Sequence, residues 1–196
     1  MPVTVAVESS WDASVAVAAC TLRPWSGSVW RCHGRQYAGD NAEGSLKVSG
    51  RFNRGTDTFP AHETWAVLYT SVAQHVALGE RIRHTPVSNL RNLANQRMSR
   101  LRVDLQVVIC ACLPERCAQL MVPGLDEADL CHLTNHRKTQ AFALAVRTVA
   151  EALLIPSCTK FPEGNLIIFP DRMMPGSTIL VEETQDPELV VDWDSL

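Results

Sequence analysis

The sequence of 196 residues lacks the long apolar run that a membrane span requires, since no stretch approaches about 20 apolar residues. Its N-terminal stretch also lacks a basic start, and it carries Glu8 and Asp12 where a secretory signal peptide would be uncharged. We therefore expect a soluble cytoplasmic protein without a membrane partner.

A CxxC pair is also missing, although the sequence contains seven cysteines. An odd number of cysteines without paired spacing indicates neither a disulfide framework nor a zinc ribbon. We expect reduced, mostly buried thiols and no metal site. Cys110 and Cys112 would share one face of a strand, where packing in the core is favoured over metal binding.

Two glycine patterns typical of enzymes are absent as well. No GxGxxG fingerprint of a dinucleotide-binding fold occurs, and no GxSxG surrounds Ser157 in the segment LLIPSC. Ser157 is therefore not expected to act as a nucleophile.

The overall charge excludes a general binder of polyanions. A net charge of -3 gives no excess of Lys and Arg with which to neutralise phosphates. Residues 81–103 do contain six arginines and no acid, but they lack an aromatic residue on which a base could stack, so nucleic acid is not an expected partner. Residues 182–196 contain six acids and no base. We interpret the two blocks as solvated faces that partly complement each other, with a partner-binding surface as the alternative.

Hydrophobic periodicity predicts a mixture of strands and helices. The expected strands cover residues 28–33, 65–71, 104–113, 165–170, 177–182 and 188–193. A helix capped by Ser71 is expected over residues 71–84, and a second helix capped by Thr139 over residues 139–154. Without repeats or βαβ alternation, this pattern indicates one α+β domain.

Candidate chemistry starts with a basic loop region. Residues 31–54 carry a local charge of +3, five basic side chains less two acidic ones, in glycine-rich loops. Such loops let main-chain N–H groups and guanidinium groups approach a phosphate, so an anion site at Arg51 and a solvated basic loop both stay open. Glu80 and His84 are four residues apart, a spacing that by itself favours a simple surface pair.

Taken in order, four segments resemble the RES domain family, which is named for its Arg, Glu and Ser. The segments are VWRCHGRQYAGDNAEG, SGRFN, LYTSVAQHVALGERIRH and TQAFALAVRTVAEALLIPSCTKFPEGNLIIFP, and they cover most of residues 28–170. The signature residues of the family map onto Arg51, Tyr69, Glu80 and Ser157. Ser49 and Phe52 depart from the Gly and Trp that are more usual around the arginine.

The resemblance implies a single domain with a fold similar to that of ADP-ribosyltransferase toxins, with two small sheets and flanking helices around an NAD cleft. We assign residues 28–181 to this RES domain, residues 1–27 to an N-terminal extension, and residues 182–196 to an acidic C-terminal segment of the same domain. The implied function is that of a bacterial toxin that consumes NAD and is neutralised by an Xre-type antitoxin. A homodimer is left open.

The resemblance also assigns roles to residues. Cleavage of the nicotinamide–ribose bond passes through an oxocarbenium-like state, and nicotinamide leaves as a neutral molecule that needs no general acid. Ionised Glu80 would stabilise the developing charge, Tyr69 would stack on the nicotinamide ring, and Arg51 would hold the pyrophosphate. The expected NAD contacts are Arg31, Arg51, Asn53, Tyr69 and Ser157, with His84 as a further candidate. The role of Ser157 is left open among binding phosphate, positioning the amide or ribose, and holding the loop.

The acceptor decides which enzyme this would be. Water would make it an NAD glycohydrolase, inorganic phosphate as co-substrate would make it an NAD phosphorylase, and a protein side chain would make it an ADP-ribosyltransferase. No cofactor beyond NAD as substrate is expected. A non-catalytic interaction module on the same fold is the alternative outside enzymology.

Overall fold

The computed structural model describes residues 11–113, 117–159 and 161–187. Six strands are present in this part of the chain: β1 (Thr21–Gly34), β2 (Leu68–Ser71), β3 (Gln96–Cys110), β4 (Ala152–Pro156), β5 (Gly164–Ile168) and β6 (Thr178–Gln185). The α-helices are α1 (Ala13–Ala18), α2 (Gly44–Lys47), α3 (Gln74–Arg83), α4 (Glu127–Cys131) and α5 (Arg137–Val146). Short 3-10 helices cover Ala61–Glu63, Val87–Asn95 and Pro170–Arg172. The prediction of an α+β domain is confirmed.

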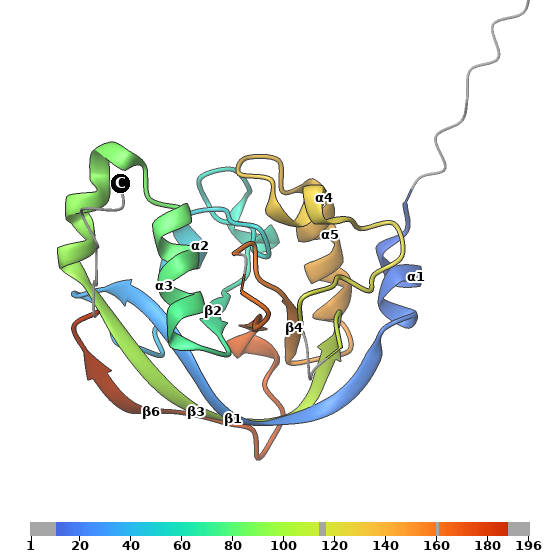
Figure 1. The fold of residues 1–196 in the computed structure, drawn as a ribbon. Coiled ribbons are helices and arrows are strands. Elements are labelled where there is room, and N and C mark those ends of the chain that lie inside the picture. The colour runs from blue at the N-terminus through green and yellow to red at the C-terminus, as the bar shows by residue number, and fades with distance from the viewer. Residues whose placement is uncertain (1–10, 114–116, 160, 188–196) are drawn as a thin grey trace, which may run out of the picture.

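All six strands belong to one sheet with the order β1-β2-β5-β4-β3-β6, and β1 also pairs with β3. Strand β3 is long enough to pair with β1 along one edge and with both β6 and β4 along the other. The sheet is strongly curved, and α3, α4 and α5 lie on its concave side (Figure 1). The expectation of two small sheets is wrong. The long strands β1 and β3 run along the whole curve and join all six strands into one sheet.

The core lies on both faces of this sheet. Leu153 and Ile155 of β4 pack in a cluster with Phe142 and Val146 of α5, whereas Leu154 packs in a second cluster on the opposite face. Successive residues of a strand point to opposite faces. Every residue of β4 and β5 is buried, so these two strands form the covered centre of the sheet.

The second expected helix is shorter than predicted. Helix α5 ends at Val146, and the apolar run that follows the turn pairs as β4 with β3 and β5. A short apolar run fits a buried strand as well as a helix, and neighbouring strands decided between them. Buried Glu151 stabilises this junction by accepting from the main-chain N–H groups of Gln106 (2.7 Å) and Val107 (2.9 Å).

Both predicted helix caps are wrong. Ser71 ends β2, and α3 begins after Ala73 without a side-chain cap. Thr139 lies inside α5, whose first residue is Arg137, and its hydroxyl donates to the carbonyl of His136 at 3.1 Å.

Five of the expected strands, at residues 28–33, 65–71, 104–113, 165–170 and 177–182, correspond to β1, β2, the end of β3, β5 and β6. The sixth, at residues 188–193, lies outside the described residues. The segment assigned as an N-terminal extension contributes α1 and the first half of β1, and Ala16 and Val17 of α1 are buried in the core.

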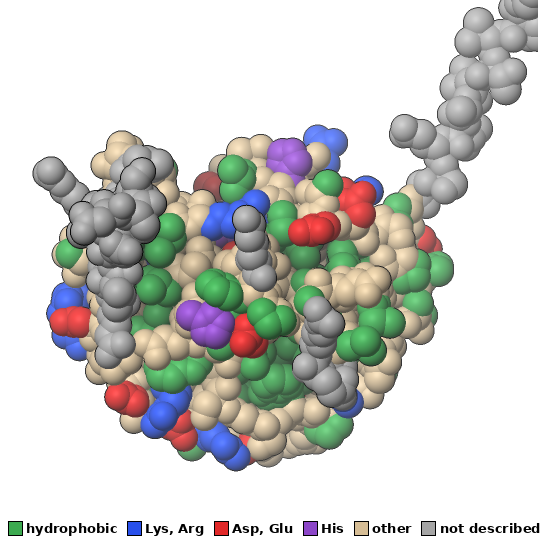
Figure 2. Space-filling view, viewed as in Figure 1, with side chains coloured by type: hydrophobic (Ala, Val, Ile, Leu, Met, Phe, Trp, Pro, Cys, Tyr) green, Lys and Arg blue, Asp and Glu red, His purple; other side chains and the backbone are tan. Residues whose placement is uncertain are grey.

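The basic and acidic blocks meet where β3 pairs with β6. Arg100 lies 3.1 Å from Glu182 and 3.5 Å from Glu183, and Arg97 lies 3.4 Å from Asp186. Figure 2 shows basic and acidic side chains next to each other over these strands. The interpretation that the two blocks partly complement each other is confirmed for these residues.

None of the helices in the described ranges is long and apolar enough to cross a membrane.

Candidate active site

A tight loop carries Arg51. The main-chain N–H of Gly50 donates to the carbonyl of Asn53 at 3.2 Å. A Cβ atom at Gly50 would lie 2.7 Å from Asn53 Oδ1 and from Tyr69 Oη, so any larger residue would displace one of these two groups. From α5, Gln140 Nε2 donates to the carbonyls of Gly50 and Asn53, at 3.0 Å each. Strand β2 and helix α5 thereby position the arginine.

Tyr69 supports the same loop through its hydroxyl, which accepts from the N–H of Phe52 (3.0 Å) and donates to Asn53 Oδ1 (2.8 Å). Burial raises the pKa of Tyr69 to about 12, so this hydroxyl stays protonated. The amide of Asn53 also donates to the carbonyls of Ser45 and Val48. In this structure the amide of Asn53 therefore holds the loop.

The two departures from the family pattern are accommodated inside the protein. Phe52 is fully buried and belongs to the core cluster of α5, so its ring is remote from solvent. Ser49 donates through its hydroxyl to Asp57 Oδ1 at 2.7 Å, which braces the start of the loop.

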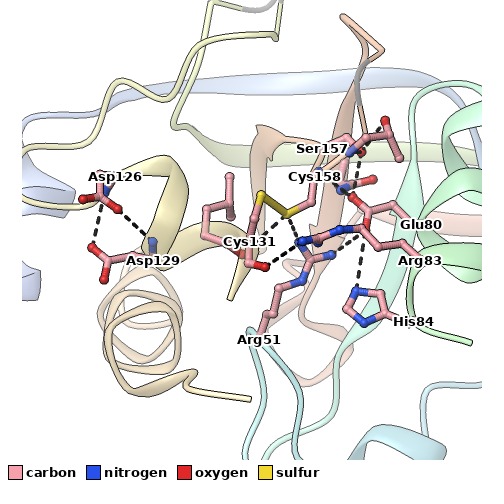
Figure 3. Close-up of a disulfide and its surroundings, with 12 residues drawn as sticks. Arg51, Glu80, Arg83, His84, Asp126, Asp129, Cys131, Ser157 and Cys158 are labelled. Carbon is pink, nitrogen blue, oxygen red and sulfur yellow. Dashed lines mark hydrogen bonds and ion pairs between the residues drawn. A yellow bond between two sulfur atoms is a disulfide. The ribbon is translucent and has the colours of Figure 1, made fainter. Parts of the chain in front are cut away.

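Glu80, near the end of α3, lies among four hydrogen-bond donors. Oε1 accepts from Ser157 Oγ (2.7 Å), from the main-chain N–H of Cys158 (2.8 Å) and from Asn165 Nδ2 (2.8 Å). Oε2 lies 2.8 Å from Arg51 Nη2 (Figure 3). The residues after β4 and at the start of β5 therefore hold one carboxylate oxygen, and the arginine loop holds the other.

These neighbours keep Glu80 ionised. Burial alone would raise the pKa of Glu80, but His84, Arg51, Ser157 and Asn165 together hold it well below its ordinary value. His84 Nε2 lies 3.7 Å from Glu80 Oε2. The spacing had favoured a simple surface pair, which is wrong because Glu80 is buried.

Arg51 is directed at protein groups in this structure. Its side chain is 7% exposed, with Nη2 on Glu80 and Nη1 2.6 Å from Cys158 Sγ. Arg51 was expected to hold a pyrophosphate, and here its guanidinium pairs with the carboxylate.

Two cysteine pairs correct the expectation of reduced thiols. Cys131 is bonded to Cys158 next to Glu80 and Arg51, with a Cα–Cα distance of 5.4 Å (Figure 3). The other disulfide joins Cys112 to Cys117, with a Cα–Cα distance of 5.1 Å. The spacings of 27 and 5 residues carry no CxxC signal, so the pairing depends on tertiary structure. The other three cysteines are Cys20, Cys32 and Cys110, which are free.

A cleft of about 1020 Å³ opens beside these residues. Its lining includes Arg31, Arg51, Asn53, Tyr69, Glu80 and His84. Burial lowers the pKa of Arg31 to about 10, although Asp40 opposes the change, so Arg31 remains a cation and donates to the carbonyl of Gly39 at 2.9 Å. The residues predicted from the sequence thus lie together at one cleft. Ser157 is not part of its lining and contacts the site by donating to Glu80 Oε1.

Three neighbours of the site were not predicted as functional. Asn165 stands in the NL of the last family segment, and that position is the one signal that could have indicated it. The main-chain N–H of Cys158 and the ring of His136, which lines the cleft, have no sequence signal. Burial and the nearby charge of Arg51 lower the pKa of His136, so its ring is neutral at pH 7. Among the residues that the structure describes, no group of three or more His, Cys, Asp or Glu could hold a metal ion.

Comparison with known proteins gives a family and a fold. No curated protein matches the chain. Among solved structures, it is similar to a chain of the M. tuberculosis MbcT-MbcA toxin-antitoxin complex, at 17% identity and a TM-score of 0.70, over 89% of this chain and 91% of that one. The RES domain family matches residues 28–194. The chain therefore belongs to the RES domain family.

Proposed function

We propose that this protein cleaves the nicotinamide–ribose bond of NAD. The observation that carries the proposal is an ionised, buried Glu80 paired with Arg51 at the wall of a cleft of about 1020 Å³. Such a cleft reaches the upper end of the roughly 300–1,000 Å³ that small-molecule sites occupy. Membership of the RES family supports NAD as the substrate.

Glu80 would act through its negative charge. The bond breaks as positive charge develops on the ribose ring, and nicotinamide departs as a neutral base. Oε1 already accepts three hydrogen bonds, so Oε2 is the oxygen left to face a ribose hydroxyl or the developing cation. A fixed anion of this kind stabilises the transition state without having to reorganise.

Arg51 and Tyr69 would bind the substrate. For Arg51 to reach the pyrophosphate, its Nη2 must exchange Glu80 Oε2 for a phosphate oxygen, which frees Oε2 for the ribose. Tyr69 lines the cleft, where a cationic nicotinamide ring could stack on its ring. Arg31, also in the lining, supplies a second cation for the phosphates.

The test is incubation of the purified protein with NAD, followed by measurement of released nicotinamide. We expect release by the wild type and a loss on the order of 10² or more for Glu80→Gln, with binding of NAD retained. Arg102→Gln, an exposed change on β3, is the matched control and should keep the full rate. No release at micromolar enzyme, with and without phosphate, would contradict the proposal.

The same assay identifies the acceptor. We infer water or inorganic phosphate, because the proposed site is a small-molecule cleft with its cations inside it. ADP-ribose as product indicates a glycohydrolase, and a phosphorylated ADP-ribose that forms only with phosphate present indicates a phosphorylase. Label from NAD on a lysate protein would instead indicate transfer to a macromolecule.

We further propose a toxin role with an antitoxin as partner. The support is RES family membership and a fold similar to a chain of a solved toxin-antitoxin complex. Expression of the wild type alone should stop growth and deplete cellular NAD, whereas Glu80→Gln should do neither. If wild type and Glu80→Gln both stopped growth, toxicity would not depend on NAD cleavage.

A further inference from the structure

A buried hydrogen-bonded chain leads from β2 to the carboxylate of Glu80. Ser71 and Asn165 are direct partners in the pairing of β2 with β5, and each is 3% exposed. Ser71 Oγ donates to Asn165 Oδ1 at 2.6 Å, and Asn165 Nδ2 donates to Glu80 Oε1 at 2.8 Å. These two hydrogen bonds therefore connect the covered centre of the sheet to the carboxylate of the candidate site.

The chemistry of the three groups allows one arrangement. An ionised carboxylate only accepts hydrogen bonds, so the amide of Asn165 must present its NH₂ group to Glu80 and its oxygen to Ser71. The hydroxyl of Ser71 then serves as the donor that satisfies Oδ1. Because all three groups are buried, any other orientation would leave an unpaired polar atom away from water.

We propose that Asn165, oriented by Ser71, is a positioning residue for Glu80. It occupies Oε1 as the third donor, keeps the carboxylate ionised and leaves Oε2 for the substrate. The inference deepens the proposed NAD cleavage and rests on it for its kinetic consequence. Its structural consequence, a lowered proton affinity of Glu80, is measurable without substrate.

Two variants test this series of hydrogen bonds, and a residue next to Ser71 on β2 serves as the control. Asn165→Asp replaces the donor by an isosteric carboxyl group, and Ser71→Ala removes the group that orients the amide. Thr70→Val is the matched control, because it deletes a neighbouring buried hydroxyl that donates to the carbonyl of Leu166 at 2.6 Å. The first readout is kcat and KM for nicotinamide release from pH 2 to pH 8. The second is the pKa of Glu80 from carboxyl NMR shifts.

We expect Asn165→Asp to lower kcat by on the order of 10- to 100-fold at pH 7, with a smaller change in KM, because a hydrogen bond to a charged group is lost. The acid limb of its rate profile and the pKa of Glu80 should both move upward by at least about one pH unit, since two carboxyl groups then share a proton. Ser71→Ala should shift both in the same direction by less, and Thr70→Val should shift neither.

A lowered melting temperature with an unmoved pKa and an unmoved pH profile in both variants would show a merely structural role and overturn the proposal. Ser71→Ala keeps the test open if Asn165→Asp does not fold. If the wild type releases no nicotinamide, NAD cleavage is refuted, and the NMR titration alone decides on Asn165. An upward shift in Asn165→Asp then supports the positioning role, and no shift rejects it.

Discussion

At the scale of single residues, hydrogen bonds and charge outweigh burial at Glu80. Taking a carboxylate out of water raises the pKa of Glu80, but His84, the guanidinium of Arg51 and the donors Ser157 and Asn165 together lower it more strongly. A general acid near neutral pH needs a raised pKa, whereas an electrostatic stabiliser needs only to be ionised. The environment of Glu80 thus suits stabilisation of a cation.

The lowered pKa predicts how stability depends on pH. Because the pKa of Glu80 in the folded protein lies below its ordinary value of 4.5, its ionisation contributes stability that is complete above that pH and is lost as the pH falls further. Urea unfolding between pH 6 and pH 3 should therefore show a shallower fall in the free energy of unfolding for Glu80→Gln than for wild type. Glu127→Gln, which removes an exposed carboxylate on α4, should keep the wild-type slope, and equal slopes for all three proteins would refute this.

Ser157 should matter as a donor and form no covalent bond. Its hydroxyl is one of three donors to Glu80 Oε1, so Ser157→Ala should slow nicotinamide release by on the order of 10-fold without abolishing it. Intact mass spectrometry of wild type mixed with NAD should show no adduct. An ADP-ribose adduct on Ser157, together with complete inactivity of the variant, would make it a nucleophile after all.

At the scale of elements, the turn between β4 and β5 assembles the site. It carries Ser157 and Cys158 directly after β4, and Asn165 follows at the start of β5. These strands pair with each other and with β3 and β2, so the donors to Glu80 stand on the most covered part of the sheet. A rigid base of this kind keeps donor positions constant while substrate enters and leaves.

The two disulfides should stabilise the fold unequally. In a chain-entropy description, a loop of 27 residues gains about 3.5 kcal/mol from cross-linking and a loop of 5 residues about 2 kcal/mol. Reduction should lower the midpoint of urea unfolding, and Cys131→Ala should remove more of this dependence on reductant than Cys117→Ala. The number of titratable thiols in the unfolded protein should rise from three to seven on reduction, and seven thiols without reductant would show that no disulfide forms.

At the scale of the whole molecule, the curved sheet brings together charges that are far apart in the sequence. Arg100 on β3 lies opposite Glu183 on β6, and Glu182 also reaches it. The acidic segment therefore neutralises part of the arginine block inside one chain. This arrangement reduces the positive surface that a partner could use at Arg97 and Arg100.

These pairs predict a small stability effect that depends on salt. Arg100→Glu should lower the free energy of unfolding by about 0.5–1 kcal/mol at low salt, because the side chains are partly exposed. Adding Glu182→Lys and Glu183→Lys should restore most of the loss, and 1 M salt should reduce all the differences. Arg172→Glu, on the exposed helix Pro170–Arg172, serves as the charge-matched control. A loss that the two lysines fail to restore would show that pairing is not its cause.

Local patterns predicted a large part of the structure. Five strands and the first helix follow from apolar residues that form short runs or recur with helical spacing, and these preferences agree with the packing of the folded protein. The second helix was predicted too long because the apolar run after Ala150 fits either structure until β3 and β5 lie beside it. The caps at Ser71 and Thr139 failed because strand pairing and helix packing set where each element begins and ends.

The order and spacing of the four segments that carry Arg51, Tyr69, Glu80 and Ser157 are properties of the sequence alone. They sufficed to place the chain in the RES family and to predict residues of the candidate site. The tertiary structure alone decided that the pKa of Glu80 lies below its ordinary value, that Arg51 pairs with it and that Cys131 bonds to Cys158. The physical reason is distance along the chain. Proton affinity and disulfide pairing depend on groups within a few ångströms, and here folding brings those groups together from segments tens of residues apart.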